Sequence, residues 1–283
     1  MPFSRHAPPA PTASTIAAPG LGGHPDRHFP LESGGARKAR RALASAAMMA
    51  TLLATTQARA EDPTAIAPFS AAPVGAAPAP WQFETLPKKK DTAFAVVSLD
   101  GRQVLKADAD ASYGNLVHDL HLGVDGPAWL AWRWRVDQLV ENADLTSRAG
   151  DDSPARVCVF FDFDASKLPF GERASLRIAR SMSGVDVPTE TLCYVWDNKL
   201  PVGTRMNNAF TKRVRLIVLQ SGTGKLGQWV SERRDVAADY LRAFADEAGG
   251  VVPIITGVGL SADSDNTQGH GVAYFGDVTI SPK

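Results

Sequence analysis

Short segments with alternating side-chain character constrain the fold of this chain more than any other feature. In the segment 129–136, WLAWRWRV, every second residue from position 130 onward is large and apolar, whereas Arg133 and Arg135 lie between them. Successive side chains of a strand point to opposite faces of a sheet, so this pattern predicts a strand with one buried face. The segments 155–163 and 212–220 combine an apolar set with an arginine-bearing set in the same way. We therefore expect packed sheets, each with a core face and a partly polar outer face.

Nine such segments follow one another after residue 91, and turn signals such as Asp100-Gly101 separate them. The predicted strands are 92–99, 102–108, 112–120, 129–136, 155–163, 190–196, 212–220, 252–262 and 271–280. Many short strands without intervening long helices favour a β-sandwich or jelly roll over a fold in which strands and helices alternate.

Only one helix has a clear pattern. Asp235 can cap it, and apolar residues such as Tyr240 and Phe244 recur at helical spacing after the cap. Residues 172–187 are expected to form a connection with some local structure. The predicted fold class is therefore all-β, a jelly-roll-like β-sandwich with one short α-helix near 235–245.

The first sixty residues have the layout of an export signal. The basic cluster RKARR precedes the apolar run ALASAAMMATLLA, and a small-residue A-x-A site follows at 58–60. The run is too short to span a bilayer, so we expect residues 1–60 to be a leader with a signal peptide that is cleaved after Ala60. Cleavage would release a protein without a transmembrane segment into the periplasm. The alternative is an Ala-rich surface helix in a disordered leader.

Charge separates this leader from the rest of the chain. The chain carries 30 basic and 30 acidic side chains, but residues 1–60 hold seven basic and two acidic ones, which leaves a net charge of −5 for the remainder. A mildly acidic domain lacks the cationic footprint of sequence-independent nucleic-acid binding, so no nucleic-acid partner is expected. Residues 61–80 are rich in Ala and Pro and are expected to form an extended, poorly ordered linker. Residues 81–283 are expected to form a single β-sandwich domain.

The two cysteines fall in strand-like runs, Cys158 in RVCVFF and Cys193 in TLCYVW. On adjacent strands in an oxidising periplasm they could form a disulfide. Two buried apolar thiols are the alternative. The sequence leaves both open, because the distance between the two Cα atoms decides between them.

Five runs of the chain carry a family resemblance. They are PAWLAWRWRV (127–136), GDDSPARVCVFFDF (150–163), YVWDNKLPVG (194–203), GQWVSERRDVAADYLRAF (227–244) and DSDNTQGHGVAYFGDVTI (263–280). In this order they resemble a bacterial family of unknown function, DUF3047, from about Trp81 to the C-terminus. The resemblance implies a jelly-roll sandwich of the galactose-binding, carbohydrate-module type, and it implies no assigned activity.

Arginines on three predicted strands are the leading ligand-binding candidates. They are Arg133, Arg135, Arg156, Arg213 and Arg215. If all of them project opposite the apolar residues, they form one arginine-bearing face. The planar guanidinium suits carboxylate or phosphate, so such a face would suit an acidic glycan such as a uronate, a phosphorylated glycan or a lipid head group. The alternative is that these arginines pair with nearby aspartates and complete the surface of the sandwich.

Tryptophans divide into two groups by the same alternation. Trp132 and Trp134 lie on the apolar face of their segment and are expected in the core. Trp129, Trp196 and Trp229 are the candidates for stacking on sugar rings, because aromatic faces complement apolar ring faces.

The loop that begins at Asp263 offers a weak calcium site. Asp263, Asp265 and Asn266 supply oxygen ligands at i, i+2 and i+3, which a hard cation could use. Jelly rolls of the resembled type often carry a structural calcium. The alternative is a turn in which these side chains bond their own backbone. No other cofactor is expected.

The sequence contains no catalytic motif that we can assign. It lacks a G-x-S-x-G elbow, and its close carboxylate pairs, Asp151/Asp152 and Asp162/Asp164, are common in an acidic chain. We therefore expect non-catalytic binding of a carbohydrate or another cell-envelope polymer. A periplasmic glycan hydrolase or lyase that uses a carboxylate pair is one alternative. A structural interaction partner in an envelope assembly is another.

Overall fold

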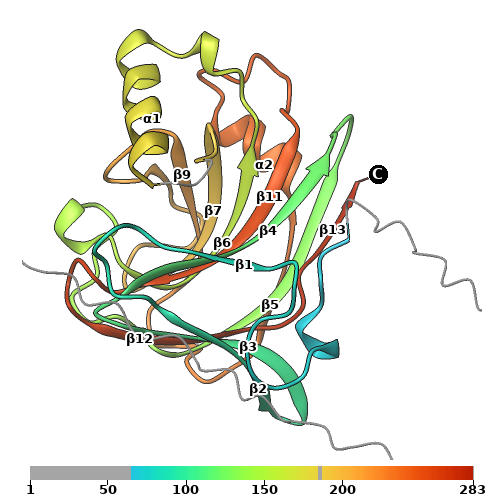
Figure 1. The fold of residues 1–283 in the computed structure, drawn as a ribbon, viewed down its shortest axis with the longest axis vertical. Helices are drawn as coiled ribbons and strands as arrows, with labels where there is room; N and C mark the ends of the chain where they lie inside the picture. The colour runs from blue at the N-terminus through green and yellow to red at the C-terminus, as the bar shows by residue number, and fades with distance from the viewer. Residues whose placement is uncertain (1–64, 184–186, 283) are drawn as a thin grey trace, which may run out of the picture. The chain divides into compact units, whose positions relative to one another are not determined.

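The computed structural model describes residues 65–183 and 187–282, which fold into two β-sheets packed face to face (Figure 1). In spatial order, the seven-stranded sheet consists of β1 (Gln82–Glu84), β4 (Tyr113–Leu122), β11 (Ile255–Asp263), β6 (Ser153–Phe161), β7 (Glu190–Asp197), β9 (Val214–Ser221) and β8 (Arg205–Asn207). The six-stranded sheet consists of β10 (Val230–Asp235), β5 (Ala128–Gln138), β12 (His270–Phe275), β3 (Arg102–Asp110) and β2 (Ala93–Leu99), with β13 (Thr279–Pro282) also paired to β5. Paired strands are antiparallel except for β7 and β9. The predicted jelly-roll-like β-sandwich is confirmed.

All nine predicted strands are present, and the last one is divided into β12 and β13. The three strands that the sequence did not predict, β1, β8 and β10, lie at sheet edges. β1 and β8 have only three residues each, too few for alternation to show. β10 has the mostly polar sequence VSERRD, and edge strands that face water on one side tolerate such a composition.

Large aromatic side chains fill the space between the sheets. Trp132 of β5 packs on Trp134 and on Tyr194 of β7, with ring centroids 5.6 and 5.2 Å apart. Trp134 packs edge-on against Trp196 at 5.8 Å. The placement of Trp132 and Trp134 in the core is therefore as predicted. The alternation of β5 then directs Arg133 to the outer face of its sheet.

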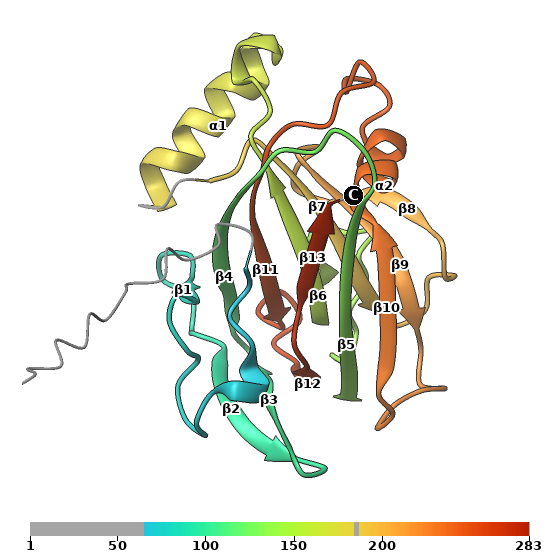
Figure 2. The same ribbon diagram turned by 90° about the vertical axis from the view of Figure 1, so that its right-hand side faces the viewer.

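Two α-helices lie at the upper end of the sandwich in Figures 1 and 2. The predicted helix is α2 (Val236–Ala243), and the Asp235 side chain caps it by accepting a hydrogen bond from the Ala238 backbone N–H. The structure adds α1 (Phe170–Ser183), where only a connection was expected. This helix buries Leu176 and exposes Phe170 and Ile178. Three 3₁₀ turns complete the elements: Phe69–Ala71, Arg148–Gly150 and Ala165–Lys167.

The expected linker over 61–80 differs from the structure in its described part, 65–80. Phe69 is fully buried and stacks on Trp81 at 5.0 Å. The Trp81 indole N–H donates to the Ala67 carbonyl, and the Ala67 N–H donates to Nε2 of His118. Two apolar anchors thus attach an Ala/Pro-rich segment to the sandwich, and composition averaged over the segment does not reveal them.

The predicted signal peptide and its cleavage site lie outside the described residues. No helix within residues 65–183 and 187–282 is long and apolar enough to cross a membrane.

A buried carboxyl group connects α2 to the seven-stranded sheet. Glu190 of β7 has no exposed surface, and the Tyr240 hydroxyl of α2 donates to it at 2.5 Å. Arg213, just before β9, bonds both Glu190 and Glu247, at 3.1 and 2.8 Å. Burial outweighs these contacts and raises the pKa of Glu190 from 4.5 to about 7.

This carboxyl should make stability depend on pH. With a raised pKa, the folded chain binds a proton between pH 4.5 and 7 that the unfolded chain releases, so the Glu190 contribution is full at low pH and is lost as pH rises through 7. The slope from one such group is about 1.4 kcal/mol per pH unit. Glu190→Gln should reduce the slope across this window in urea unfolding at pH 5, 6, 7 and 8. Glu172→Gln, which changes the partly exposed partner of Arg213, serves as the control. An unchanged slope in Glu190→Gln would contradict the assignment.

Candidate functional site

The outer face of the seven-stranded sheet carries a groove of about 680 Å³. Strand register assembles its floor. Asn115 of β4 lies opposite Ser261 of β11, which lies opposite Arg156 of β6. Side chains two residues further along each strand share this face, because alternate residues of a strand point the same way. Strands that are far apart in the sequence therefore contribute side chains to the floor of the groove.

An aromatic ring lies across β11 in this floor. Gly257 and Gly259 are paired with Phe160 and Cys158 of β6. A Cβ atom on Gly259 would lie 2.7 Å from Cζ of Phe160, and one on Gly257 would lie 3.1 Å from its Cδ2. The half-buried Phe160 ring thus occupies the space that two missing side chains leave, and it lines the groove.

Sequence analysis missed Phe160 as a site residue. Three tryptophans were favoured because aromatic faces complement sugar rings, and Phe160 was assigned only to an alternating strand. The signal that could have identified it is the spacing of Gly257 and Gly259 in an otherwise apolar strand, because glycine inside a strand marks the close approach of another group.

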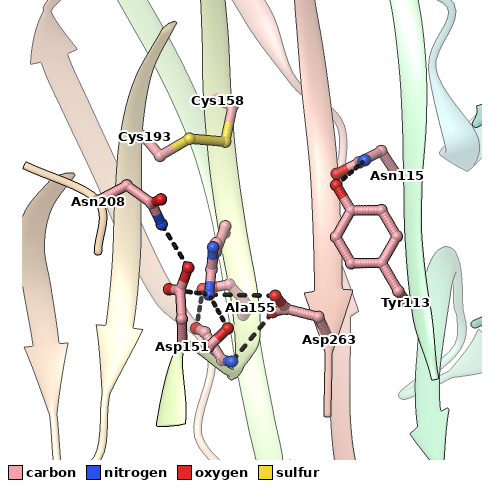
Figure 3. Close-up of a disulfide and its surroundings, with 10 residues drawn as sticks. Tyr113, Asn115, Asp151, Ala155, Cys158, Cys193, Asn208 and Asp263 are labelled. Atoms are coloured by element: carbon pink, nitrogen blue, oxygen red, sulfur yellow. Dashed lines mark hydrogen bonds and ion pairs between the residues drawn. A yellow bond between two sulfur atoms is a disulfide. The ribbon is translucent and has the colours of Figure 1, made fainter. Parts of the chain in front are cut away.

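A disulfide lies next to this ring. Cys158 of β6 and Cys193 of β7 are opposite each other in register, with Cα atoms 4.0 Å apart, and their sulfurs are bonded (Figure 3). Of the two states that the sequence leaves open, the structure has the disulfide. Both half-cystines line the groove, so the covalent link between β6 and β7 is part of its floor.

A buried ion-pair cluster forms one end of the groove. Arg156 bonds Asp151 at 3.1 Å and Asp263 at 3.2 Å, and Asn208, just after β8, donates to Asp151 at 2.5 Å (Figure 3). Burial, with the nearby charges of Asp151 and Asp152, raises the pKa of Asp263 to about 7 although Arg156 opposes the shift. Arg156 and the carboxylates of Asp151 and Asp263 hold one another in place, so few of the Arg156 donors are available to bind a ligand.

The predicted calcium ligands Asp263 and Asp265 come together with Asp152, all buried, with one oxygen of each within 4.8 Å of the others. Asn266 instead donates its amide to Asp152 at 3.2 Å. Lys89 pairs with Asp265, so lysine and arginine side chains supply positive charge at this cluster. A cation at this site remains a prediction.

Two carboxylates stand near the β1 edge of the groove. Glu84 of β1 is opposite Asn115, and Asp119 lies two strand repeats further along β4. Burial and the charge of Asp119 raise the pKa of Glu84. Within the described part of the chain, the Glu84 carboxylate has no hydrogen-bond or ion-pair partner, whereas Gln82 donates to Asp119 at 3.4 Å.

Three of the four carboxylates in the sequence-predicted pairs bond neighbouring residues of the fold, whereas Asp162 is exposed and lines the groove. Asp151 bonds Arg156 and Asn208, and Asp152 accepts from the Thr267 backbone and hydroxyl at 2.7 and 2.6 Å. Asp164 caps a 3₁₀ turn by accepting from the Ser166 backbone N–H.

The single arginine-bearing face predicted from the sequence is wrong. Arg156 lies in the groove, whereas Arg213 and Arg215 lie at the edge of the inner face of β9, where they pair with acidic residues near α2. Both faces of β9 are apolar: Ile217 belongs to the core between the sheets and Leu216 to a cluster on the groove side. Alternation therefore could not identify the core face of this strand.

The remaining two arginines lie on the six-stranded sheet. Arg135 pairs with Asp137 at 2.6 Å, and its guanidinium lies 5.9 Å from the ring centre of Tyr274. Arg133 lies 4.4 Å over the Trp229 ring. The structure thus distributes the five predicted arginines over three separate places.

The predicted stacking tryptophans also separate. Trp196 is fully buried in the core, so its prediction as a sugar platform is wrong. Trp129 and Trp229 are half-buried on the outer face of the six-stranded sheet, where Arg233 lies 3.6 Å over the Trp129 ring. None of the three lines the groove.

Comparisons with solved structures give distant likenesses. The xyloglucanase domain of NopAA from Sinorhizobium fredii, in complex with cellobiose, has 9% sequence identity and a TM-score of 0.39, with 72% of this chain and 93% of that chain covered. TmCBM61 in complex with β-1,4-galactotriose has 8% identity and a TM-score of 0.32, covering 72% and 90%. Endoglucanase 3 of Trichoderma harzianum, from family GH12, has 13% identity and a TM-score of 0.36, covering 74% and 100%.

No curated protein sequence matches the chain. A family model matches residues 79–279, from just before the buried Trp81 to the start of β13, which is most of the sequence. The matched region contains both sheets, the groove and the disulfide. The chain therefore belongs to DUF3047, a family of proteins of unknown function.

Proposed function

We propose that this chain is an exported, periplasmic glycan-binding protein that holds a neutral glycan in the groove of the seven-stranded sheet. One observation carries the proposal: the Phe160 ring lies across a strand that lacks side chains at Gly257 and Gly259, on the floor of the groove. An aromatic ring supported from below by backbone offers a flat apolar platform, and such platforms complement the apolar faces of sugar rings.

Polar groups around this platform suit the hydroxyl groups of a sugar. Asn115 of β4, Thr191 of β7 and Asn208 beside β9 line the same groove. Amide and hydroxyl side chains both donate and accept hydrogen bonds, as sugar hydroxyls do. The volume of about 680 Å³ lies within the range of roughly 300–1,000 Å³ that small-molecule sites occupy.

The charge of the groove favours an uncharged ligand over an acidic one. Its described lining contains more carboxylates than cations. The carboxylates are Glu84, Asp119, Asp151, Asp162, Asp263 and Asp265, and the cations are Lys89, Arg156 and Arg180. Lys89 and Arg156 already pair with carboxylates. An anionic sugar would meet excess negative charge here, which disfavours its binding.

Glycan hydrolysis in the same groove is the second candidate. Glu84 supports it, because this carboxylate lacks a partner among the described residues and its pKa is raised near Asp119. Glycosidases use two carboxyl groups, one as the acid and the other as base or nucleophile. Reducing-end release from cello-, xylo- and galacto-oligosaccharides, absent in Glu84→Gln, would favour this candidate.

Replacing the platform tests the binding function. Phe160→Ala should weaken binding of cellohexaose, xyloglucan heptasaccharide or β-1,4-galactotriose by about tenfold, which corresponds to about 1.4 kcal/mol from aromatic stacking. Isothermal titration calorimetry measures the affinity, and a thermal melt confirms that the variant is folded. Phe170→Ala on α1, an exposed phenylalanine outside the groove lining, is the matched control and should bind as the unaltered chain does. Equal affinities for both variants would exclude Phe160 as the platform.

Export is tested on the chain itself. The basic cluster, the short apolar run and the A-x-A site support cleavage after Ala60. The bonded Cys158 and Cys193 are consistent with an oxidising compartment. In a bacterial host, N-terminal sequencing of the periplasmic fraction should find Glu61 as the first residue. Full-length chain that begins at Met1 and remains in the cytoplasmic fraction would contradict the proposal.

A further inference from the structure

A second hollow, of about 610 Å³, lies on the other sheet. Arg133 of β5, Ser231 of β10 and Thr279 of β13 contribute to its wall, and so does Arg102 at the start of β3. Register explains this gathering, because Ser231 pairs with Arg133, and Thr279 pairs with Ala131 two residues before it. These side chains share the outer face of the six-stranded sheet, away from the core and from the groove.

The Arg133 side chain is held in place on two sides. A Cβ atom on Gly276 would lie 2.6 Å from its Cγ and Nε atoms, so the arginine stem crosses the strand connection at a position without a side chain. Its guanidinium lies 4.4 Å over the ring centre of Trp229. The Trp229 indole N–H donates to Asp100 at 3.1 Å, which fixes the ring beneath the guanidinium. A side chain held in this way loses little conformational freedom when it binds a ligand.

The hydrogen-bonding capacity of this guanidinium is unused. Within the part of the chain that the structure describes, the Arg133 side chain has neither an ion pair nor a hydrogen bond. Arg135, its neighbour on the same strand face, is bound by Asp137 and Asp100. A guanidinium has five N–H donors in a planar arrangement that matches a carboxylate with two parallel hydrogen bonds. Stacking on Trp229 leaves the edge of this plane available.

Besides Arg133, the hollow is lined by the cation Arg102 and by the acidic residues Glu232 and Asp277. Glu232 accepts from Gln220 at 2.7 Å, and Asp277 accepts from the backbone N–H and the hydroxyl of Ser70 at 2.9 and 2.5 Å. Glu232 lies opposite the core residue Trp132, and its carboxylate faces Gln220 of the other sheet rather than the hollow. Asp277 lies in the wall, where it would repel a doubly charged phosphate more than a singly charged carboxylate. The hydroxyls of Ser231 and Thr279 suit a ligand that also carries hydroxyl groups.

We propose that this hollow binds a sugar acid, a uronate residue of an acidic glycan, with the uronate carboxylate bonded by the Arg133 guanidinium. The site is separate from the groove and does not depend on the function proposed there. It assigns acidic sugars to the six-stranded sheet and neutral sugars to the seven-stranded sheet.

The experiment titrates the full mature chain with trisaccharides of α-1,4-linked galacturonate and of β-1,4-linked mannuronate, by calorimetry at low and at 0.5 M salt. At least one of them should bind, and its methyl ester should not. Arg133→Gln should weaken binding about tenfold or more, because a charge-assisted pair is lost. Arg233→Gln is the matched control, because Arg233 stacks on Trp129 on the same sheet but does not line the hollow. This variant should bind the uronate with the affinity of the unaltered chain.

The proposal for this hollow and the proposal for the groove can be tested independently of each other. Phe160→Ala should leave uronate binding unchanged, and Arg133→Gln should leave the binding of neutral oligosaccharides unchanged. Absence of binding for both uronates, or equal losses in Arg133→Gln and Arg233→Gln, would overturn the proposal. Inorganic phosphate that binds more tightly than both uronates in an Arg133-dependent way would overturn the assignment to a sugar acid.

Discussion

Packing of the aromatic side chains between the two sheets determines where every functional group of this domain lies. Trp132 and Trp134 of β5 meet Tyr194 and Trp196 of β7 across the interface. Once these rings face inward, the alternation of each strand sends the intervening side chains outward. Arg133 thereby lies on one outer surface and Cys193 on the other. The inward side chains of both sheets share one core, but their outward side chains do not contact one another. The two outer surfaces can therefore differ in charge and chemistry.

Part of this fold could be predicted from alternation, because strands such as β5 bury one face and leave the other partly exposed, and turn residues separate the strands. The strands β6, β7 and β11 are buried on both faces, so their apolar, β-branched composition predicts them instead. The method failed for β9, whose two faces are both covered: one by the core and one by the Leu216 cluster beside the groove. It also missed α1, a helix of mostly polar composition in which Leu176 is the buried residue among those described. The segment 65–80 was misjudged because the buried Phe69, which packs on Trp81, outweighs the average composition of its neighbours.

The sites were less predictable, because a site depends on which side chains lack partners as well as on which are present. From the sequence, all five arginines were equally good candidates for binding a ligand. The structure shows that four of them are engaged by carboxylates, and that Arg133 is supported by Gly276 and Trp229 instead. Phe160 was overlooked because what distinguishes it is the absence of side chains on the neighbouring strand. Contacts between segments that are distant in the sequence determine which arginine is unpaired and which ring lies over glycines. A single sequence does not reveal these contacts directly.

The glycines of β11 have a consequence for the whole family. β11 lies in the interior of its sheet, between β4 and β6, where glycine weakens a strand by roughly 0.5–1 kcal/mol relative to alanine. A side chain at Gly259 would displace the Phe160 ring, so the two positions can change only together. A family member with a bulky residue at either glycine position must have a different groove floor. These two positions therefore offer a simple criterion for sorting family members by the shape of the surface they present.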